Sequence, residues 1–215
     1  MYHITVMESI AQWFNPEFLL QYGGISLLIF IVFAETGLFF CFFFPGDSLL
    51  FTAGLLCGTS FLPYSYPVLL TAVFMAATIG SVFGYFSGKF LGTWLQRQPN
   101  SWLYRREYID IAREYHSKYK GMAFVIGRFL PIVRTFVPIL SGIIRLPFAS
   151  FMFWNVIGCL FWVPSMISIG YFLAARFPEV QQHLEKVVIF LVVITSIPVI
   201  VTFRKERKKK KENTN

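Results

Sequence analysis

Four charged residues interrupt stretches of the chain that are otherwise strongly apolar. Two are acids, Glu35 and Asp47, and two are arginines, Arg128 and Arg134. A guanidinium group is always charged and binds phosphate through paired hydrogen bonds, whereas intramembrane carboxylates are typical of proton relays. If these stretches lie in hydrocarbon, each ionised side chain costs about 2.5–3.5 kcal/mol on insertion scales and must face a partner or a water-filled cavity. We therefore take these four residues as the candidate functional residues.

A purely structural role for the four charges is the second interpretation. Asp47 follows Pro45 and Gly46, a position where an acid commonly caps a returning helix. Glu35 has no such local role, but both acids could pair with the two arginines and hold two parts of the chain together. An anionic ligand that displaces a carboxylate from its arginine would combine the two interpretations.

The two arginines can converge only if the chain is broken between them. Arg128 and Arg134 are six residues apart, which is about 600° of rotation on a straight helix and would place them on different faces. A break at Pro131, midway between them, would let both side chains reach one cavity.

Composition assigns the chain to the membrane proteins. Of its 215 residues 56% are hydrophobic and 14% are charged, whereas a soluble domain has about 25% charged residues. We expect one membrane domain over residues 1–203 and a basic cytoplasmic tail over 204–215. The net charge of +8 does not indicate nucleic-acid binding, because seven basic residues lie in 204–211, where they would meet an anionic inner leaflet. The sequence has no metal-ligand spacing, no paired histidines and no nucleophile motif, so we expect neither a cofactor nor an enzyme.

Long apolar runs predict membrane-spanning helices over about 67–92, 148–175 and 185–203. Two further apolar stretches, about 22–58 and 121–147, contain the four charges and several prolines. Proline removes a backbone donor, and hydrocarbon cannot replace the lost hydrogen bond. Both stretches are therefore predicted to be re-entrant hairpins. The residues expected to shape their turns are Pro45, Gly46, Pro131 and Pro138.

Glycines recur every fourth residue in the first predicted span. They are Gly80, Gly84, Gly88 and Gly92, and this spacing places them on one stripe of a helix. Small residues on one face let another helix approach closely, so we interpret the stripe as a packing surface rather than a ligand site.

The order of the segments predicts an inverted repeat. An amphipathic segment, a hairpin and a span occur in that order twice, starting at 8–21 and at 100–119, and one further span follows. Residues 1–66 contain no Lys or Arg, whereas 89–120 and 204–211 contain seven each. The positive-inside rule then places the N-terminus outside and the C-terminus in the cytoplasm. Two cytoplasmic basic segments require an even number of crossings between them, so the second hairpin cannot cross, and the two hairpins enter from opposite sides.

Three motifs resemble the DedA family of membrane proteins, the group with the VTT domain. They are Glu-Thr-Gly at 35–37, Pro-Gly-Asp-Ser at 45–48 and Gly-Arg-Phe-Leu-Pro-Ile-Val-Arg-Thr-Phe-Val-Pro at 127–138, followed by Gly142. Asn155, Gly158 and Trp162 are further similar features. The resemblance extends from about residue 20 to 178, which is most of the chain.

This resemblance implies facing re-entrant hairpins and a role in moving lipids across the bilayer. The residues that correspond to the acids and arginines of the family are Glu35, Asp47, Arg128 and Arg134. Gly127, Thr135 and Gly142 would then help to shape the second hairpin. Bacterial members are associated with the return of undecaprenyl phosphate, a cell-envelope carrier lipid, to the cytoplasmic leaflet. Other members are linked to movement of phosphatidylethanolamine, and dependence on the proton-motive force is reported of the family.

We therefore expect an all-α polytopic protein of the bacterial cytoplasmic membrane. Its expected architecture is an inverted repeat of amphipathic helix, re-entrant hairpin and transmembrane helix, followed by a C-terminal transmembrane helix. The expected function is proton-coupled translocation of undecaprenyl phosphate, with the two arginines on the phosphate and the two acids as their charge partners. The alternatives are a flippase or scramblase for phosphatidylethanolamine, a proton-coupled transporter of an ion or small solute, and a structural assembly factor. The expected partners are a membrane lipid and protons, and the sequence allows an oligomer.

Overall fold

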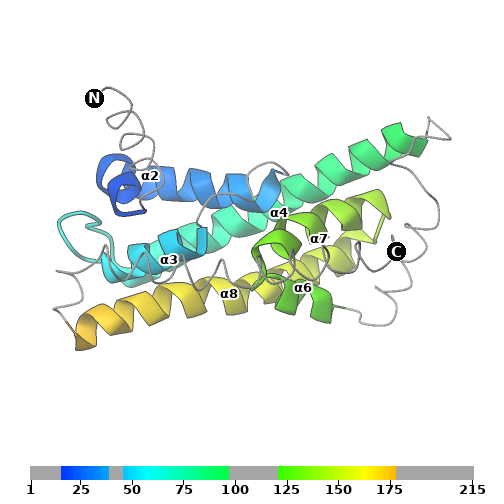
Figure 1. Ribbon diagram of the computed structural model, residues 1–215. Coiled ribbons are helices and arrows are strands. Elements are labelled where there is room, and N and C mark those ends of the chain that lie inside the picture. The colour runs from blue at the N-terminus through cyan, green and yellow to red at the C-terminus, as the bar shows by residue number, and fades with distance from the viewer. Residues whose placement is uncertain (1–15, 39–45, 97–120, 178–215) are drawn as a thin grey trace, which may run out of the picture.

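Residues 16–38, 46–96 and 121–177 are described by a computed structural model, and their regular structure is helical apart from one bridge between Cys57 and Leu62. The helices are α2 (Pro16–Gly37), α3 (Gly46–Leu55), α4 (Tyr66–Gln96), α6 (Met122–Gly127), α7 (Pro131–Ile143) and α8 (Phe148–Arg176) (Figure 1). The predicted all-α class is therefore confirmed for these ranges. The predicted features outside the described residues are the third span at 185–203, the tail at 204–215, the amphipathic segment at 100–119 and residues 8–15 of the first such segment.

The two long helices are apolar enough to cross a membrane. Tyr66–Trp94 in α4 and Phe148–Arg176 in α8 are 29 residues each. A helix of this length extends about 43 Å, more than the roughly 30 Å of a hydrocarbon core. The two helices coincide with the spans predicted near 67–92 and 148–175. Large apolar side chains are exposed on both, as contact with lipid requires: Phe83, Phe86, Phe90, Leu160, Phe161 and Phe172.

Each of the two interrupted stretches contains a pair of shorter helices, α2 with α3 and α6 with α7. The second pair is broken directly before Pro131, where the sequence predicts a break. Leu130 is extended (φ −110°, ψ 112°), which is the conformation that a following proline favours. Pro138 lies inside α7 and does not end it, so Pro138 forms no part of the turn. Because a proline withholds a single helix hydrogen bond, packing on both sides of it can keep the helix continuous.

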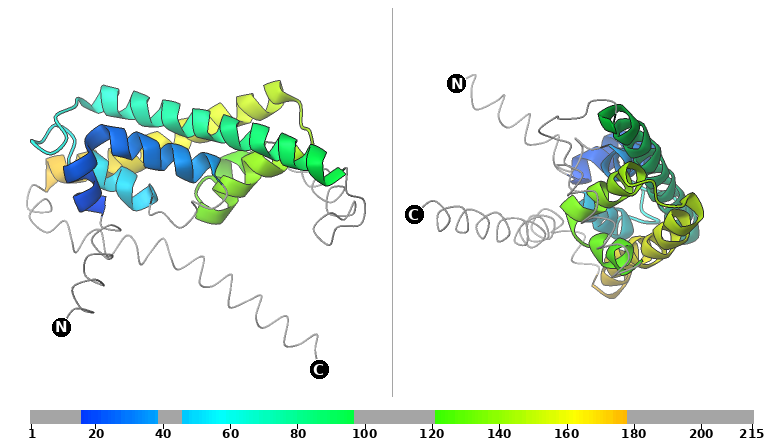
Figure 2. Two further views of the ribbon diagram at one scale, coloured as in Figure 1. Left: turned by 90° about the horizontal axis from the view of Figure 1, so that it is seen from above. Right: turned by 90° about the vertical axis from the view of Figure 1, so that its right-hand side faces the viewer.

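The short helices lie along the long ones in a reciprocal scheme. α4 packs mainly against α2 and α7, whereas α8 packs mainly against α3 and also contacts α4 and α6. Figures 1 and 2 show α2 and α7 along α4, one toward each end of it. Each long helix therefore contacts one helix from its own preceding pair and one helix from the other pair.

The glycine stripe of α4 permits this close packing. A Cβ at Gly80 would overlap Thr36 of α2, and a Cβ at Gly88 would overlap the backbone oxygen of Ile139 in α7. A Cβ at Gly92 would lie 3.0 Å from the Cα of Ile143 in α7. The stripe therefore contacts helices of both pairs, and its function is packing, as its spacing predicts.

Two apolar clusters form the core of the described residues. The larger one joins α2, α3, α4 and α8, and its most buried members include Leu28, Val32, Leu50, Leu69, Val73 and Ile167. The smaller one lies around Tyr85, Phe124 and Phe151, where the rings of Tyr85 and Phe151 stack with centroids 4.6 Å apart. The four charged candidates lie among these buried side chains, at 1–8% exposure.

Candidate functional site

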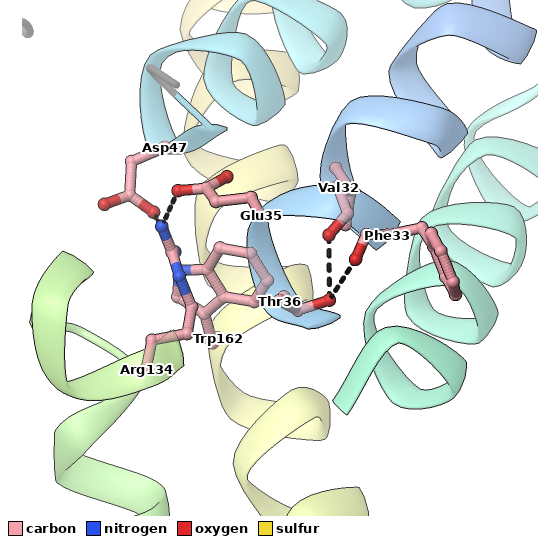
Figure 3. Close-up of polar contacts among 7 residues, drawn as sticks. All are labelled: Val32, Phe33, Glu35, Thr36, Asp47, Arg134 and Trp162. Atoms are coloured by element: carbon pink, nitrogen blue, oxygen red, sulfur yellow. Dashed lines mark hydrogen bonds and ion pairs between the residues drawn. The ribbon is translucent and has the colours of Figure 1, made fainter. Parts of the chain in front are cut away.

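Arg134 binds both acidic candidates at once. Its Nη1 donates to Oδ1 of Asp47 at 2.7 Å, and its Nη2 donates to Oε1 of Glu35. The three side chains come from α7, α3 and α2 and point toward one another (Figure 3). Since the two carboxylates are 12 residues apart in sequence and 87 or more from Arg134, only the tertiary fold brings them together.

Trp162 of α8 completes this group, which we call the Arg134 cluster (Arg134, Glu35, Asp47 and Trp162). The indole Nε1 donates to Oδ1 of Asp47 at 3.0 Å. The guanidinium carbon of Arg134 lies 4.4 Å from the centroid of the Trp162 ring, within cation–π range. Trp162 is fully buried, so both interactions are shielded from solvent.

The start of α3 provides a favourable position for Asp47 and leaves room for the side chain of Glu35. Asp47 lies in the first turn of α3, where the helix dipole favours a negative charge. Gly46 precedes it, and a Cβ at that position would overlap the carboxylate of Glu35. A glycine is therefore needed at position 46 because Glu35 approaches the start of α3 closely. The carboxylate of Asp47 accepts hydrogen bonds from Arg134 and Trp162.

Arg128 lies apart from the carboxylates and has neutral partners. Its Nη2 donates to Oγ of Ser81 in α4 at 3.0 Å and to Oδ1 of Asn155 in α8. The amide of Asn155 in turn donates to the backbone oxygen of Thr78 at 3.4 Å. Gly158 makes room for the arginine, since a Cβ there would lie 2.8 Å from Cδ of Arg128.

The pairing of Arg128 with an acid, which the sequence leaves open, is thus not found among the described residues. Both ion pairs in that part of the chain belong to Arg134. The physical reason is the break between α6 and α7: Arg128, at the end of α6, faces α4 and α8, whereas Arg134, in the first turn of α7, faces α2 and α3.

A small cavity nevertheless connects the two arginines. Its volume is about 10 Å³, which is room for about one water molecule. The side chains and glycine that line it are Phe124, Gly127, Arg128, Arg134, Val137, Pro138 and Asn155. Nη1 of Arg128 and Nε of Arg134 are both buried and have no hydrogen-bond partner among the described residues. A buried guanidinium N–H without an acceptor is costly, so this space favours an acceptor such as an oxygen.

The remaining predicted residues of the second hairpin take different positions. Gly127 ends α6, and a Cβ there would lie 2.7 Å from Cγ1 of Val133 in α7. Thr135 is buried within α7. Gly142 also lies within α7, where a Cβ would overlap the backbone oxygen of Tyr85 in α4. Gly127 therefore allows a close contact between α6 and α7, and Gly142 allows a close contact between α7 and α4.

Two long apolar helices and a buried cluster of charges at the junction of shorter helices are features expected of an integral membrane protein. Comparison with known proteins identifies the family. The VTT domain matches residues 44–172, and the chain belongs to this family, which includes the DedA proteins.

Three relatives illustrate the similarity. Protein DedA of Escherichia coli is 34% identical over 187 residues, which cover 86% of this chain and 85% of that protein. An uncharacterized membrane protein of Mycobacterium tuberculosis is 31% identical over 202 residues, covering 93% and 88%. Inner membrane protein YghB of Escherichia coli is 34% identical over 181 residues, covering 79% and 78%. These relatives are bacterial membrane proteins, and the chain is one as well. No solved structure matches the chain.

Proposed function

We propose that the protein is a flippase that carries undecaprenyl phosphate across the cytoplasmic membrane, without chemical conversion of the lipid. The observation that carries this proposal is the small cavity lined by both Arg128 and Arg134, together with one buried N–H on each arginine that has no acceptor among the described residues. Two guanidinium groups in a low-dielectric space favour an anion, and a phosphate monoester offers several oxygens to paired donors. The apolar exposed faces of α4 and α8 suit a prenyl chain that remains in the bilayer.

The charges of the site support a proton-coupled mechanism. With both acids ionised, Glu35 and Asp47 carry two negative charges against the one positive charge of Arg134, and Arg128 supplies the fourth charge from a short distance. Protonation of one carboxylate makes the remaining ion pair neutral and leaves the site with the net positive charge of Arg128. In the proposed mechanism, this state takes up the phosphate on Arg128 first, and Arg134 joins as it loses a carboxylate.

The size of the cavity requires the helices to move. A space for about one water cannot hold a phosphate group, so the described conformation is the closed one in this mechanism. Because Arg128 and Arg134 belong to α6 and α7, separating these helices from α8 would enlarge the cavity between the arginines.

The re-entrant hairpins, the inverted repeat and an outside N-terminus are part of the same proposal. The reciprocal packing supports them: α4 contacts α2 and α7, and α8 contacts α6 and α3. This is the pattern expected if α2, α3 and α4 correspond to α6, α7 and α8 through a two-fold axis in the membrane plane. The axis would pass between the pairs, where the charges from both halves meet.

The test is lipid translocation in vesicles reconstituted with the purified protein. Undecaprenyl phosphate and phosphatidylethanolamine are offered separately, and protein-dependent transfer between leaflets is measured for the wild type, Arg128→Lys and Arg134→Lys. Lysine keeps the charge but loses the paired donors, so both variants should translocate undecaprenyl phosphate more slowly. Arg176→Lys, at the exposed end of α8, is the matched control and should behave as the wild type.

Other outcomes distinguish the alternatives. Equal rates for the two lipids, unaffected by either lysine variant, would indicate nonspecific scrambling. Transport of a soluble cation without lipid translocation would instead indicate an ion or solute transporter.

A further inference from the structure

Trp162 is the one member of the Arg134 cluster that carries no formal charge, yet it contacts two of the charged members. Its N–H bonds to Asp47 at 3.0 Å and its ring lies 4.4 Å from the guanidinium carbon of Arg134. A large apolar side chain could fill the same volume without either interaction. Trp162 is therefore a fully buried indole, at the centre of a predicted transmembrane helix, that makes a hydrogen bond and a cation–π contact with charged residues.

The two carboxylates of the cluster are held unequally because of Trp162. Oδ1 of Asp47 accepts from both Arg134 and Trp162, whereas Glu35 accepts a side-chain hydrogen bond from Arg134. The other oxygen of Glu35, Oε2, is buried against the backbone of Gly46 at the start of α3 and accepts no side-chain hydrogen bond among the described residues. Moving Glu35 away from Arg134 thus breaks one side-chain hydrogen bond, whereas moving Asp47 away breaks two.

We propose that Trp162 is a positioning residue that ties Asp47 and Arg134 into one unit, and so makes Glu35 the carboxylate that leaves Arg134 when an anion binds. This inference rests on the proposed function and assigns its parts. The ring of Trp162 supports the guanidinium plane, so Arg134 can turn one edge toward the cavity without losing Asp47. The Nη2 that Glu35 gives up is then available to the anion beside the N–H groups of Arg128.

Among the described residues, the ionisable groups near the Arg134 cluster come from five helices. Glu35 comes from α2, Asp47 from α3, Arg128 from α6 and Arg134 from α7. From α8, Cys159 lies near Arg128, and its Sγ accepts a hydrogen bond from Thr78 at 3.4 Å. The described part of α4 faces this region with the hydroxyls of Thr78 and Ser81, which do not titrate. Glu35 and Asp47 are therefore the two groups through which pH can act on Arg134.

The test measures the pH dependence of undecaprenyl phosphate translocation in reconstituted vesicles for the wild type, Trp162→Phe and Trp154→Phe. Phenylalanine keeps a ring beside Arg134 but cannot donate to Asp47. Without that donor, Asp47 has Arg134 as its one side-chain donor, as Glu35 does, and becomes a second carboxylate that can leave Arg134. The midpoint of the pH profile of translocation should therefore rise by about one unit, which is a tenfold change in proton concentration. Trp154→Phe, on the same helix, should keep the wild-type midpoint.

A second variant separates the hydrogen bond from packing. Benzothienylalanine at position 162 has the shape of tryptophan with sulfur in place of the N–H, so it should fold as the wild type does and still raise the midpoint. A wild-type midpoint in this variant would overturn the positioning role of Trp162, whether or not Trp162→Phe folds. Failure of the proposed function has a different signature, because the wild type itself would then not translocate undecaprenyl phosphate.

Discussion

Replacing Arg134 by alanine should destabilise the protein far more than replacing Arg128 by alanine. Arg134→Ala removes two hydrogen bonds to ionised acceptors, each worth about 1.5–3 kcal/mol, and leaves two buried carboxylates, of which Asp47 keeps only the indole N–H. Breaking a buried ion pair costs about 3–5 kcal/mol, so we expect a loss of about 4 kcal/mol in unfolding free energy. Arg128→Ala removes bonds to neutral acceptors and also a buried cation without a carboxylate, so we expect only about 1–2 kcal/mol.

Unfolding of the variants can be measured through the buried thiol of Cys159. Once the two other cysteines are replaced, a thiol-reactive dye reacts only when unfolding exposes Cys159, which has no exposed surface in the folded chain. Thermal and denaturant unfolding of detergent-solubilised variants then gives the two free-energy changes.

A double-mutant cycle identifies the cause of the difference. Arg134→Ala combined with Glu35→Gln should show a coupling of about 1–3 kcal/mol, because the two side chains are bonded. Arg128→Ala with the same Glu35→Gln should be additive within about 0.5 kcal/mol. Equal losses for the two arginine variants, or strong coupling between Arg128 and Glu35, would refute the assignment of both carboxylates to Arg134.

Three further predictions concern transport, packing and topology. Glu35→Gln imitates the protonated acid, so undecaprenyl phosphate translocation in vesicles should lose most of its pH dependence; an unchanged pH profile would exclude Glu35 as the coupling residue. Gly88→Ala places a methyl group against the backbone oxygen of Ile139 and should cost about 1–3 kcal/mol in the same unfolding assay, whereas a wild-type stability would mean that α4 and α7 are less closely packed. In a cysteine-free background, Ser60→Cys should react with an impermeant thiol reagent added to intact cells and Ala149→Cys should not, and the reverse result would invert the proposed topology.

Hydropathy and the placement of charges predict most of the helical framework. The spans near 67–92 and 148–175, the break before Pro131 and the presence of buried, paired charges follow from length, proline chemistry and the cost of charge in hydrocarbon. The partner of each arginine could not be predicted. That choice depends on how α6 and α7 are rotated about their own axes, which a six-residue spacing across a break does not define.

Asn155 and Trp162 of α8 are named from the sequence only as features of the family, and their contacts with the two arginines were not predicted. Asn155 binds Arg128 and Trp162 contacts Arg134, and the two are seven residues apart on one helix. Residues at this spacing share a helix face, about 10.5 Å apart along the axis. An amide and an indole on one face of an otherwise apolar span are a polar pattern that could have been read as the counterpart of two arginines.

The glycine stripe of α4 has a consequence for how the helices would move in the proposed mechanism. At Gly84 a Cβ would lie 3.4 Å from the backbone oxygen of Gly37 in α2 and 3.4 Å from Cβ of Pro138 in α7, so this glycine marks the seam where the two short helices meet. Side chains that interlock resist sliding, whereas a glycine track offers a smooth backbone surface. On such a surface a lengthwise shift of α7 would rearrange few side-chain rotamers. If α7 moves when the site opens, we therefore expect it to slide along α4, and bulky residues at Gly88 or Gly92 would oppose this sliding.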